Sequence, residues 1–251
     1  MARRVILPIH GFLVASAIAS PLLGLLQDRT GLDPNVLRLT VFSTAVGAGL
    51  VGLIWRRRLA YPPTIPRSRG RSLAASVAMC LLAGLAMWLL ARAQDAPWRP
   101  PAAGSLGAPL VVVLVVQLLG AAAEEVGWRG LIQPLLETRL AAWQAALITG
   151  ALFGAGHFYL AFGLSPAAFA LFIVSAIAIS LILALATVGR GWLGRVAIAT
   201  ALHFLINMQT LFLFADGDGS VRYFADLAAV FGLLGLVALW TITRWRIVSA
   251  D

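Results

Sequence analysis

Residues 109–130 read PLVVVLVVQLLGAAAEEVGWRG, an apolar run followed directly by two adjacent carboxylates, Glu124 and Glu125. Acidic residues are rare in this chain, with 10 among 251. A carboxylate in a membrane-grade segment costs on the order of several kcal/mol unless partners or water meet it, so it predicts a functional site. Arg129 follows Glu125 by four residues, which predicts an ion pair on one helix face. We therefore expect Glu124 to be the carboxylate that does chemistry.

The composition predicts an all-α, polytopic membrane protein. Hydrophobic residues make up 61% of the chain and charged residues 12%, and the mean hydropathy is +0.92. These values exclude an ordinary soluble domain and a disordered chain. The net charge of +9 comes from Arg in short loops between apolar segments, which favours contact with membrane lipids and gives no reason to expect a nucleic-acid partner. Cys80 is the only cysteine, so one chain can form neither a disulfide nor a thiolate zinc site.

We expect a single transmembrane domain over residues 1–251, with about eight helices and an intramembrane catalytic cavity. Both termini are predicted to be cytoplasmic, because 14 of the 19 Arg then lie on that side. The Arg-only, Gly- and Ala-rich composition is typical of a high-GC prokaryote, which predicts a prokaryotic plasma membrane. The expected spans, of which the first three lie at about 5–91, are 5–26, 36–55, 73–91, 107–126, 142–162, 166–188, 192–214 and 221–243.

Two histidines lie within expected spans, His157 in LFGAGHFYL and His203 in TALHFLINMQ. Phe153 precedes His157 by four residues and Asn207 follows His203 by four, so each pair shares a helix face. Together with the glutamate pair, these residues come from three spans, and they can converge only in a polar cavity typical of catalysis or transport. His10, near the cytoplasmic end of the first span, is interpreted as structural.

The chemistry of this set allows two interpretations. A glutamate and a histidine can move a proton near neutral pH, while a second histidine with an asparagine can donate hydrogen bonds to a developing oxyanion. Two imidazoles with one or two carboxylates are also the ligands of an open catalytic zinc site. The sequence has no HExxH motif. A bound metal and a water activated directly by glutamate therefore both remain open.

Three motifs carry a family resemblance. EEVGWR fits EExxxR, FGAGH fits FxxxH and HFLIN fits HxxxN, in the order seen in the CPBP intramembrane proteases, which include CAAX prenyl endopeptidases and bacteriocin-immunity proteins. The motif-bearing part covers about 107–210, whereas the first three spans resemble the family only in being apolar. The resemblance implies a membrane-embedded, metal-dependent hydrolase with a conical cavity that opens to the cytoplasm.

The resemblance also implies a role for each catalytic residue. Glu124 resembles the general base that activates water, and His157 its partner. His203 and Asn207 resemble the pair that stabilises the oxyanion. If zinc or another divalent metal is bound, the implied ligands are His157, His203 and Glu124, while a metal-free mechanism stays open.

The supporting residues implied by the resemblance are Glu125 with Arg129, as the ion pair that orients the site, and Phe153, as a packing residue. The implied substrate is a lipidated or membrane-associated peptide, with a prenylated CAAX tail as one form. Two alternatives remain, a non-enzymatic immunity or scaffold protein and a proton-coupled transporter. For a transporter we would expect an inverted repeat, and the first half of the chain has almost no intramembrane charge.

One difficulty concerns depth in the membrane. At a helix rise of about 1.5 Å per residue, His157 lies roughly 22 Å from the cytoplasmic end of a span that begins at Ala142, and Glu124 lies within about 10 Å of that face. We expect the spans to be offset, with residues 131–140 dipping as an interfacial segment.

Overall fold

The computed structural model describes residues 3–30, 37–57, 59, 61–64, 69–96, 106–214 and 219–247, and within these ranges the chain forms helices and no strand. Each expected span contains one α-helix. Six helices are long and apolar enough to cross a membrane, judged by length and composition: Val5–Thr30, Gly70–Ala93, Leu110–Glu137, Pro166–Thr187, Trp192–Leu213 and Val221–Arg244. The expected all-α, polytopic membrane fold is confirmed.

Two of the expected spans contain shorter helices. α2 (Ser43–Trp55), preceded by the 3-10 turn η1 (Leu39–Phe42), has 13 residues, and α6 (Ala142–Gly156) has 15. At about 1.5 Å per residue, α6 is roughly 22 Å long, less than the roughly 30 Å of a bilayer core. The expected span at 142–162 therefore ends early, at Gly156, and a 3-10 turn η3 (Phe158–Phe162) follows.

The chain divides into two compact units. Unit 1 comprises Met1–Thr64, Ala102–Arg139 and Arg190–Phe204, and unit 2 comprises Ile65–Pro101, Leu140–Gly189 and Leu205–Asp251. Helix α8 (Trp192–Phe214) contributes its first half to unit 1 and its second half to unit 2. The expectation of a single domain over residues 1–251 stays a prediction.

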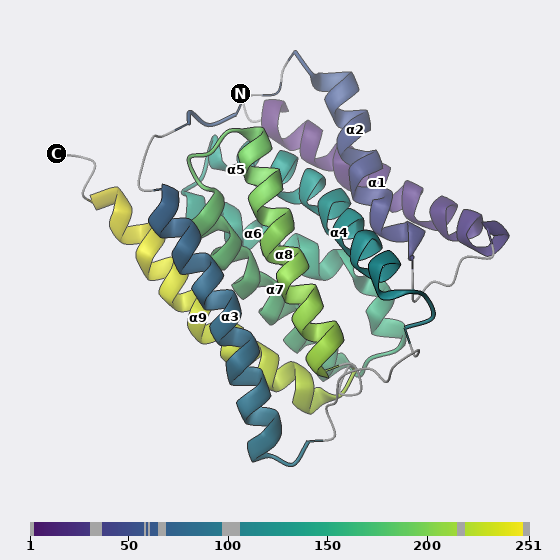
Figure 1. Cartoon of the computed structure of the whole chain (residues 1–251). Helices are drawn as coiled ribbons and strands as arrows, with labels where there is room; N and C mark the ends of the chain where they lie inside the picture. The colour runs from purple at the N-terminus through teal and green to yellow at the C-terminus, as the bar shows by residue number, and fades with distance from the viewer. Residues whose placement is uncertain are drawn as a thin grey trace. The chain divides into compact units, whose positions relative to one another are not determined.

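Unit 1 is built on α1 (Arg3–Thr30), α2, α4 (Leu110–Gly127) and the first half of α8 (Figure 1). The α1–α2 contact is close because Gly47 has no side chain, and a Cβ there would lie 3.0 Å from the carbonyl oxygen of Phe12. Phe12 also packs its ring edge-on to Trp128, with centroids 5.2 Å apart. These contacts place α1 and α2 beside the C-terminal end of α4, where the glutamate pair lies.

The helix that carries the glutamate pair is longer than expected. It does not end near residue 126 but continues through a π turn, Trp128–Ile132, into α5 (Gln133–Glu137), which gives a continuous helix from Leu110 to Glu137. Leu131, Ile132 and Leu135 are buried. The interfacial position expected for residues 131–140 stays a prediction; residues 131–137 continue the helix, and their apolar side chains are covered by protein.

Unit 2 is organised around α7 (Pro166–Thr187), which packs against α6, α3 (Arg69–Ala93) and α9 (Val221–Ile247) (Figure 1). Ser165 caps α7 by accepting a hydrogen bond from the Ala168 amide, and Pro166 follows as the first helical residue. Close approach again depends on glycine, since a Cβ at Gly150 would lie 2.6 Å from the Cα of Ile177. Gly154, four residues later, allows the same close approach, since a Cβ there would lie 3.0 Å from the Cα of Ile173.

Candidate active site

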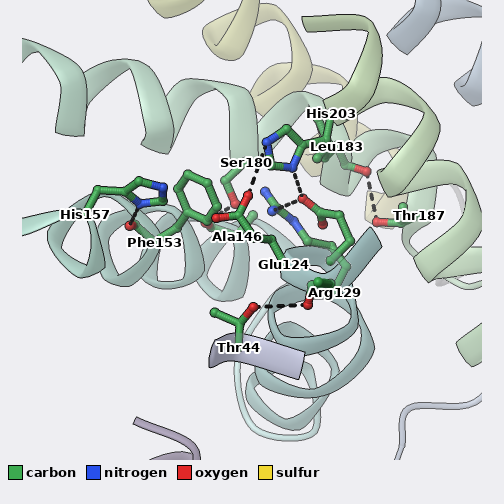
Figure 2. A network of polar contacts seen from close by, with 12 residues as sticks. Thr44, Glu124, Arg129, Ala146, Phe153, His157, Ser180, Leu183, Thr187 and His203 are labelled. Carbon is green, nitrogen blue, oxygen red and sulfur yellow. Dashed lines mark hydrogen bonds and ion pairs between the residues drawn. The ribbon is translucent and has the colours of Figure 1, made fainter. Parts of the chain in front are cut away.

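Glu124, Glu125, Arg129 and His203 form one buried polar cluster in unit 1 (Figure 2). Two helices supply them. Glu124 and Glu125 lie in the last turn of α4, Arg129 lies in the π turn that follows, and His203 lies on α8. The exposed fraction of the side chain is 0% for Glu125, 3% for Arg129, and 12% for both Glu124 and His203. Water therefore reaches Glu124 and His203 more readily than the other two side chains.

Glu125 is the anchor of the cluster. Its Oε1 accepts hydrogen bonds from Arg129 Nη1 at 2.9 Å and lies 2.8 Å from His203 Nδ1. The ion pair expected between Glu125 and Arg129 is thus present. A carboxylate paired with a buried guanidinium is ionised and can only accept, so His203 donates through Nδ1. Glu125 therefore fixes both the orientation and the tautomer of the imidazole.

With Nδ1 held on Glu125, the other ring nitrogen of His203, Nε2, faces Glu124. Nε2 lies 3.6 Å from Oε2 of Glu124, longer than a hydrogen bond but within ion-pair range. When His203 carries a proton on both ring nitrogens, this contact is an ion pair with the Glu124 carboxylate. An imidazole oriented by one carboxylate and facing a second is an arrangement suited to general acid–base chemistry.

The glutamate pair is supported from α2 as well. Thr44 donates its hydroxyl to the carbonyl oxygen of Ala123, the residue before Glu124, at 3.0 Å (Figure 2). Gly127, one turn further along α4, faces the same region, and a Cβ there would lie 2.7 Å from Phe12. The local backbone of the pair is therefore held from α1 and α2, a contact that the sequence patterns did not predict.

The remaining expected site residues, His157, Phe153 and Asn207, belong to unit 2. His157 is not inside a helix as expected but is the C-cap of α6, because the helix ends at Gly156. Its Nδ1 lies 2.8 Å from the carbonyl oxygen of Phe153, and their ring centroids are 4.5 Å apart (Figure 2). Phe172 on α7 packs against His157 as well, with centroids 5.4 Å apart. The backbone bond fixes Nδ1 as the donor and leaves Nε2 as the acceptor in the neutral ring.

Asn207 lies on α8 one turn after His203, at the position its sequence spacing predicts. The structure brings together Glu124, Glu125, Arg129 and His203 in one unit, and His157 with Phe153 in the other. The convergence of the two groups, with Asn207, stays a prediction.

The donor set of the cluster matches a metal site in part. Ligating histidines commonly donate their other ring nitrogen to a carboxylate, as His203 does to Glu125, which leaves Nε2 and the Glu124 carboxylate as two suitable ligands. Among the residues that the structure describes, however, no group of three or more His, Cys, Asp or Glu side chains is placed to hold an ion. The described cluster therefore supplies two of the ligands that a metal site would need.

A second buried network in unit 1 lies outside the three motifs. Arg195 on α8 forms a two-pronged ion pair with Glu137 at the end of α5, with Nη1–Oε1 at 3.0 Å and Nη2–Oε2 at 2.6 Å. Gln133 donates to the same carboxylate at 2.8 Å, and Arg195 Nε donates to the carbonyl oxygen of Arg190. The sequence analysis gave Arg195 no role, whereas its side chain is buried in this ion pair. The two partners lie 58 residues apart in the sequence, so no local pattern could have found the pair.

The fold and the cluster define an α-helical membrane protein with a carboxylate–histidine centre, and the family comparison narrows this class. Residues 106–209 match the family model described as type II CAAX prenyl endopeptidase Rce1-like. The chain therefore contains a domain of this family, and the resemblance seen in the three motifs is confirmed. A search of the curated proteins found no match.

Proposed function

We propose that this protein is an intramembrane endopeptidase that hydrolyses peptide bonds with a water molecule activated by Glu124. Its family domain supports a CAAX-type intramembrane endopeptidase. The observation that carries the proposal is the placement of His203, with Nδ1 on Glu125 and Nε2 facing Glu124. A purely structural ion pair would need only Glu125 and Arg129, and would leave no reason for a second carboxylate against the same imidazole.

In the proposed reaction, Glu124 takes a proton from water as the water oxygen attacks the carbonyl carbon of the scissile bond. His203 is protonated on both ring nitrogens in this step, so Nδ1–H stays on Glu125 while Nε2–H donates a hydrogen bond to the tetrahedral oxyanion. Glu124 then passes its proton to the leaving nitrogen, the carbon–nitrogen bond breaks, and a carboxylic acid and an amine are released while Glu124 returns to its ionised form. Glu125 holds the imidazole in place and balances its positive charge throughout.

His157 and Asn207 have proposed roles taken from the resemblance, His157 as the partner of Glu124 and Asn207 as the second oxyanion donor. The proposed substrate is a lipidated or membrane-associated peptide, and a prenylated CAAX peptide is the first to test. Zinc or another divalent metal remains a proposed cofactor, with His157, His203 and Glu124 as its ligands.

The test is cleavage of a farnesylated CAAX peptide, beside the same peptide without its lipid, by purified protein in liposomes. We expect the wild type to cleave the lipidated peptide and Glu124→Gln to be inactive at unchanged folded yield. Cleavage at the wild-type rate by Glu124→Gln would remove the general-base role. Metal analysis of the same samples separates the two chemistries, since stoichiometric zinc supports the ligand set and cleavage by metal-free protein supports direct activation by glutamate.

A further inference from the structure

The second buried network has a consequence for the site, because both charged contacts join the same two helices within unit 1. Glu125 meets His203, and Glu137 meets Arg195. Along the Leu110–Glu137 helix the order is Glu125 then Glu137, whereas along α8 the order is Arg195 then His203. The two helices are therefore antiparallel here and are joined at two levels. Two fixed points determine the sliding and rotation of one helix against the other, which a single contact cannot do.

The π turn is what allows both glutamates to face α8. Glu125 and Glu137 are 12 residues apart. At about 3.6 residues per turn, 12 residues of α-helix would leave the two side chains roughly 120° apart. A π turn takes one residue more than an α turn, so across Trp128–Ile132 the same 12 residues complete close to three whole turns. The extra residue thus returns Glu137 to the face that carries Glu125.

The helices also approach closely at this turn. Gly130 lies within the π segment, and a Cβ there would lie 3.0 Å from Trp192 Nε1 and from Val196 Cγ2 on α8. The Arg195–Glu137 pair is buried, with exposed side-chain fractions of 2% and 4%. A buried ion pair contributes little net stability against an apolar pair of similar size, and its best-attested use is to specify register.

We propose that Glu137 and Arg195 are positioning residues that, with the π turn, fix the register of α8 so that His203 lies on Glu125. The inference rests on the proposed function for its effect on activity, but its effect on His203 can be measured without any substrate. The planar guanidinium of Arg195 donates two parallel hydrogen bonds to Glu137, and these fix both the distance and the rotation of one helix against the other. A lysine would keep the charge and lose that control.

The first variant to test is Arg195→Lys, with Arg57→Lys as the matched control, because Arg57 is exposed at the end of α2 in the same unit. We expect kcat of Arg195→Lys to fall by about 10- to 100-fold with KM nearly unchanged, the scale of effect that a misplacement of about 1 Å produces. The control should match the wild type. Wild-type kcat in Arg195→Lys would overturn the proposal.

The second variant replaces the network by apolar residues, Glu137→Leu with Arg195→Met, and adds Gln133→Leu because Gln133 donates to Glu137. Such a replacement commonly preserves stability, so it separates folding from positioning. We expect a melting temperature near that of the wild type together with the same loss of kcat. Full activity in this variant would show that the pair is only structural.

The readout that does not need activity is the imidazole nitrogen spectrum of the protein labelled at histidine, since the chain has only 3 histidines. We expect the His203 resonances to change in both variants, while those of His10, whose Nδ1 lies on the Ile6 carbonyl oxygen, stay in place. An unchanged His203 spectrum would overturn the inference. If the wild type cleaves no peptide but His203 still shifts, the proposed function fails and the positioning role stands.

Discussion

The adjacent glutamates give a matched pair of substitutions, because Glu124→Gln and Glu125→Gln make the same chemical change one residue apart. Glu125 is fully buried and accepts from both Arg129 and His203 through one oxygen. A glutamine keeps the shape and one acceptor oxygen but leaves the buried guanidinium without its counter-charge. Breaking a buried ion pair in this way costs about 3–5 kcal/mol, and the acceptor that remains places Glu125→Gln near the lower end.

For a chain of this size, about 3 kcal/mol corresponds to a fall in melting temperature of roughly 6–12 °C. Glu124 lies 3.6 Å from Nε2 of His203, beyond hydrogen-bond distance, so Glu124→Gln should lower stability by only about 1 kcal/mol. The assay is thermal unfolding in one detergent, followed by peptide cleavage by the folded fraction. We expect both variants to lose activity and only Glu125→Gln to lose stability.

The result that would refute this reasoning is an equal change in melting temperature for the two variants, or none for Glu125→Gln. Equal changes would mean that burial and pairing do not distinguish the two carboxylates. Full activity in a stable Glu125→Gln would show that the imidazole does not need a charged anchor.

Three further predictions concern the stability of the fold. Gly150→Ala should lower stability by about 1–3 kcal/mol in thermal unfolding, because the new Cβ meets the α7 backbone, while Gly232→Ala, with open space around it, should not; equal effects would contradict the packing. Thr44→Val should cost about 1 kcal/mol by losing its hydrogen bond to Ala123, whereas Thr44→Ser, which keeps the hydroxyl, should retain most of that stability; an unchanged stability in Thr44→Val would contradict a role for the bond. Arg129→Met should cost about 3–5 kcal/mol, and Arg129→Lys clearly less, in the same assay; equal losses would show that charge is not what matters there.

Much of the fold follows from local pattern. Apolar runs of membrane length predicted where the helices lie, and the spacing of Glu125 and Arg129 predicted their ion pair, because residues four apart meet on any α-helix. The helix ends were harder. The short length of α6 places His157 at a C-cap, since the chain leaves the helix at Gly156 although the sequence stays apolar. Hydropathy measures membrane affinity and does not report where a helix stops.

The contacts between helices could not be read from the sequence. That His203 would lie on Glu125 depends on how α8 packs, and the π turn at Trp128–Ile132 leaves no clear mark in the sequence apart from Gly130. Arg195 shows the same limit, because an Arg beside apolar residues is equally suited to a loop facing the lipid headgroups and to a buried ion pair. Only the partner distinguishes the two environments, and Glu137 lies 58 residues earlier in the chain.

The central claim is that Glu124 activates water for peptide hydrolysis. The most direct measurement is mass spectrometry of the cleaved CAAX peptide after reaction in heavy-oxygen water, with the wild type beside Glu124→Gln. We expect the wild type to place one heavy oxygen in the new carboxyl group, and Glu124→Gln, folded to the same yield, to give no product. Labelled product from Glu124→Gln at the wild-type rate would contradict the claim, as would a folded wild type that cleaves neither the lipidated peptide nor its unlipidated control.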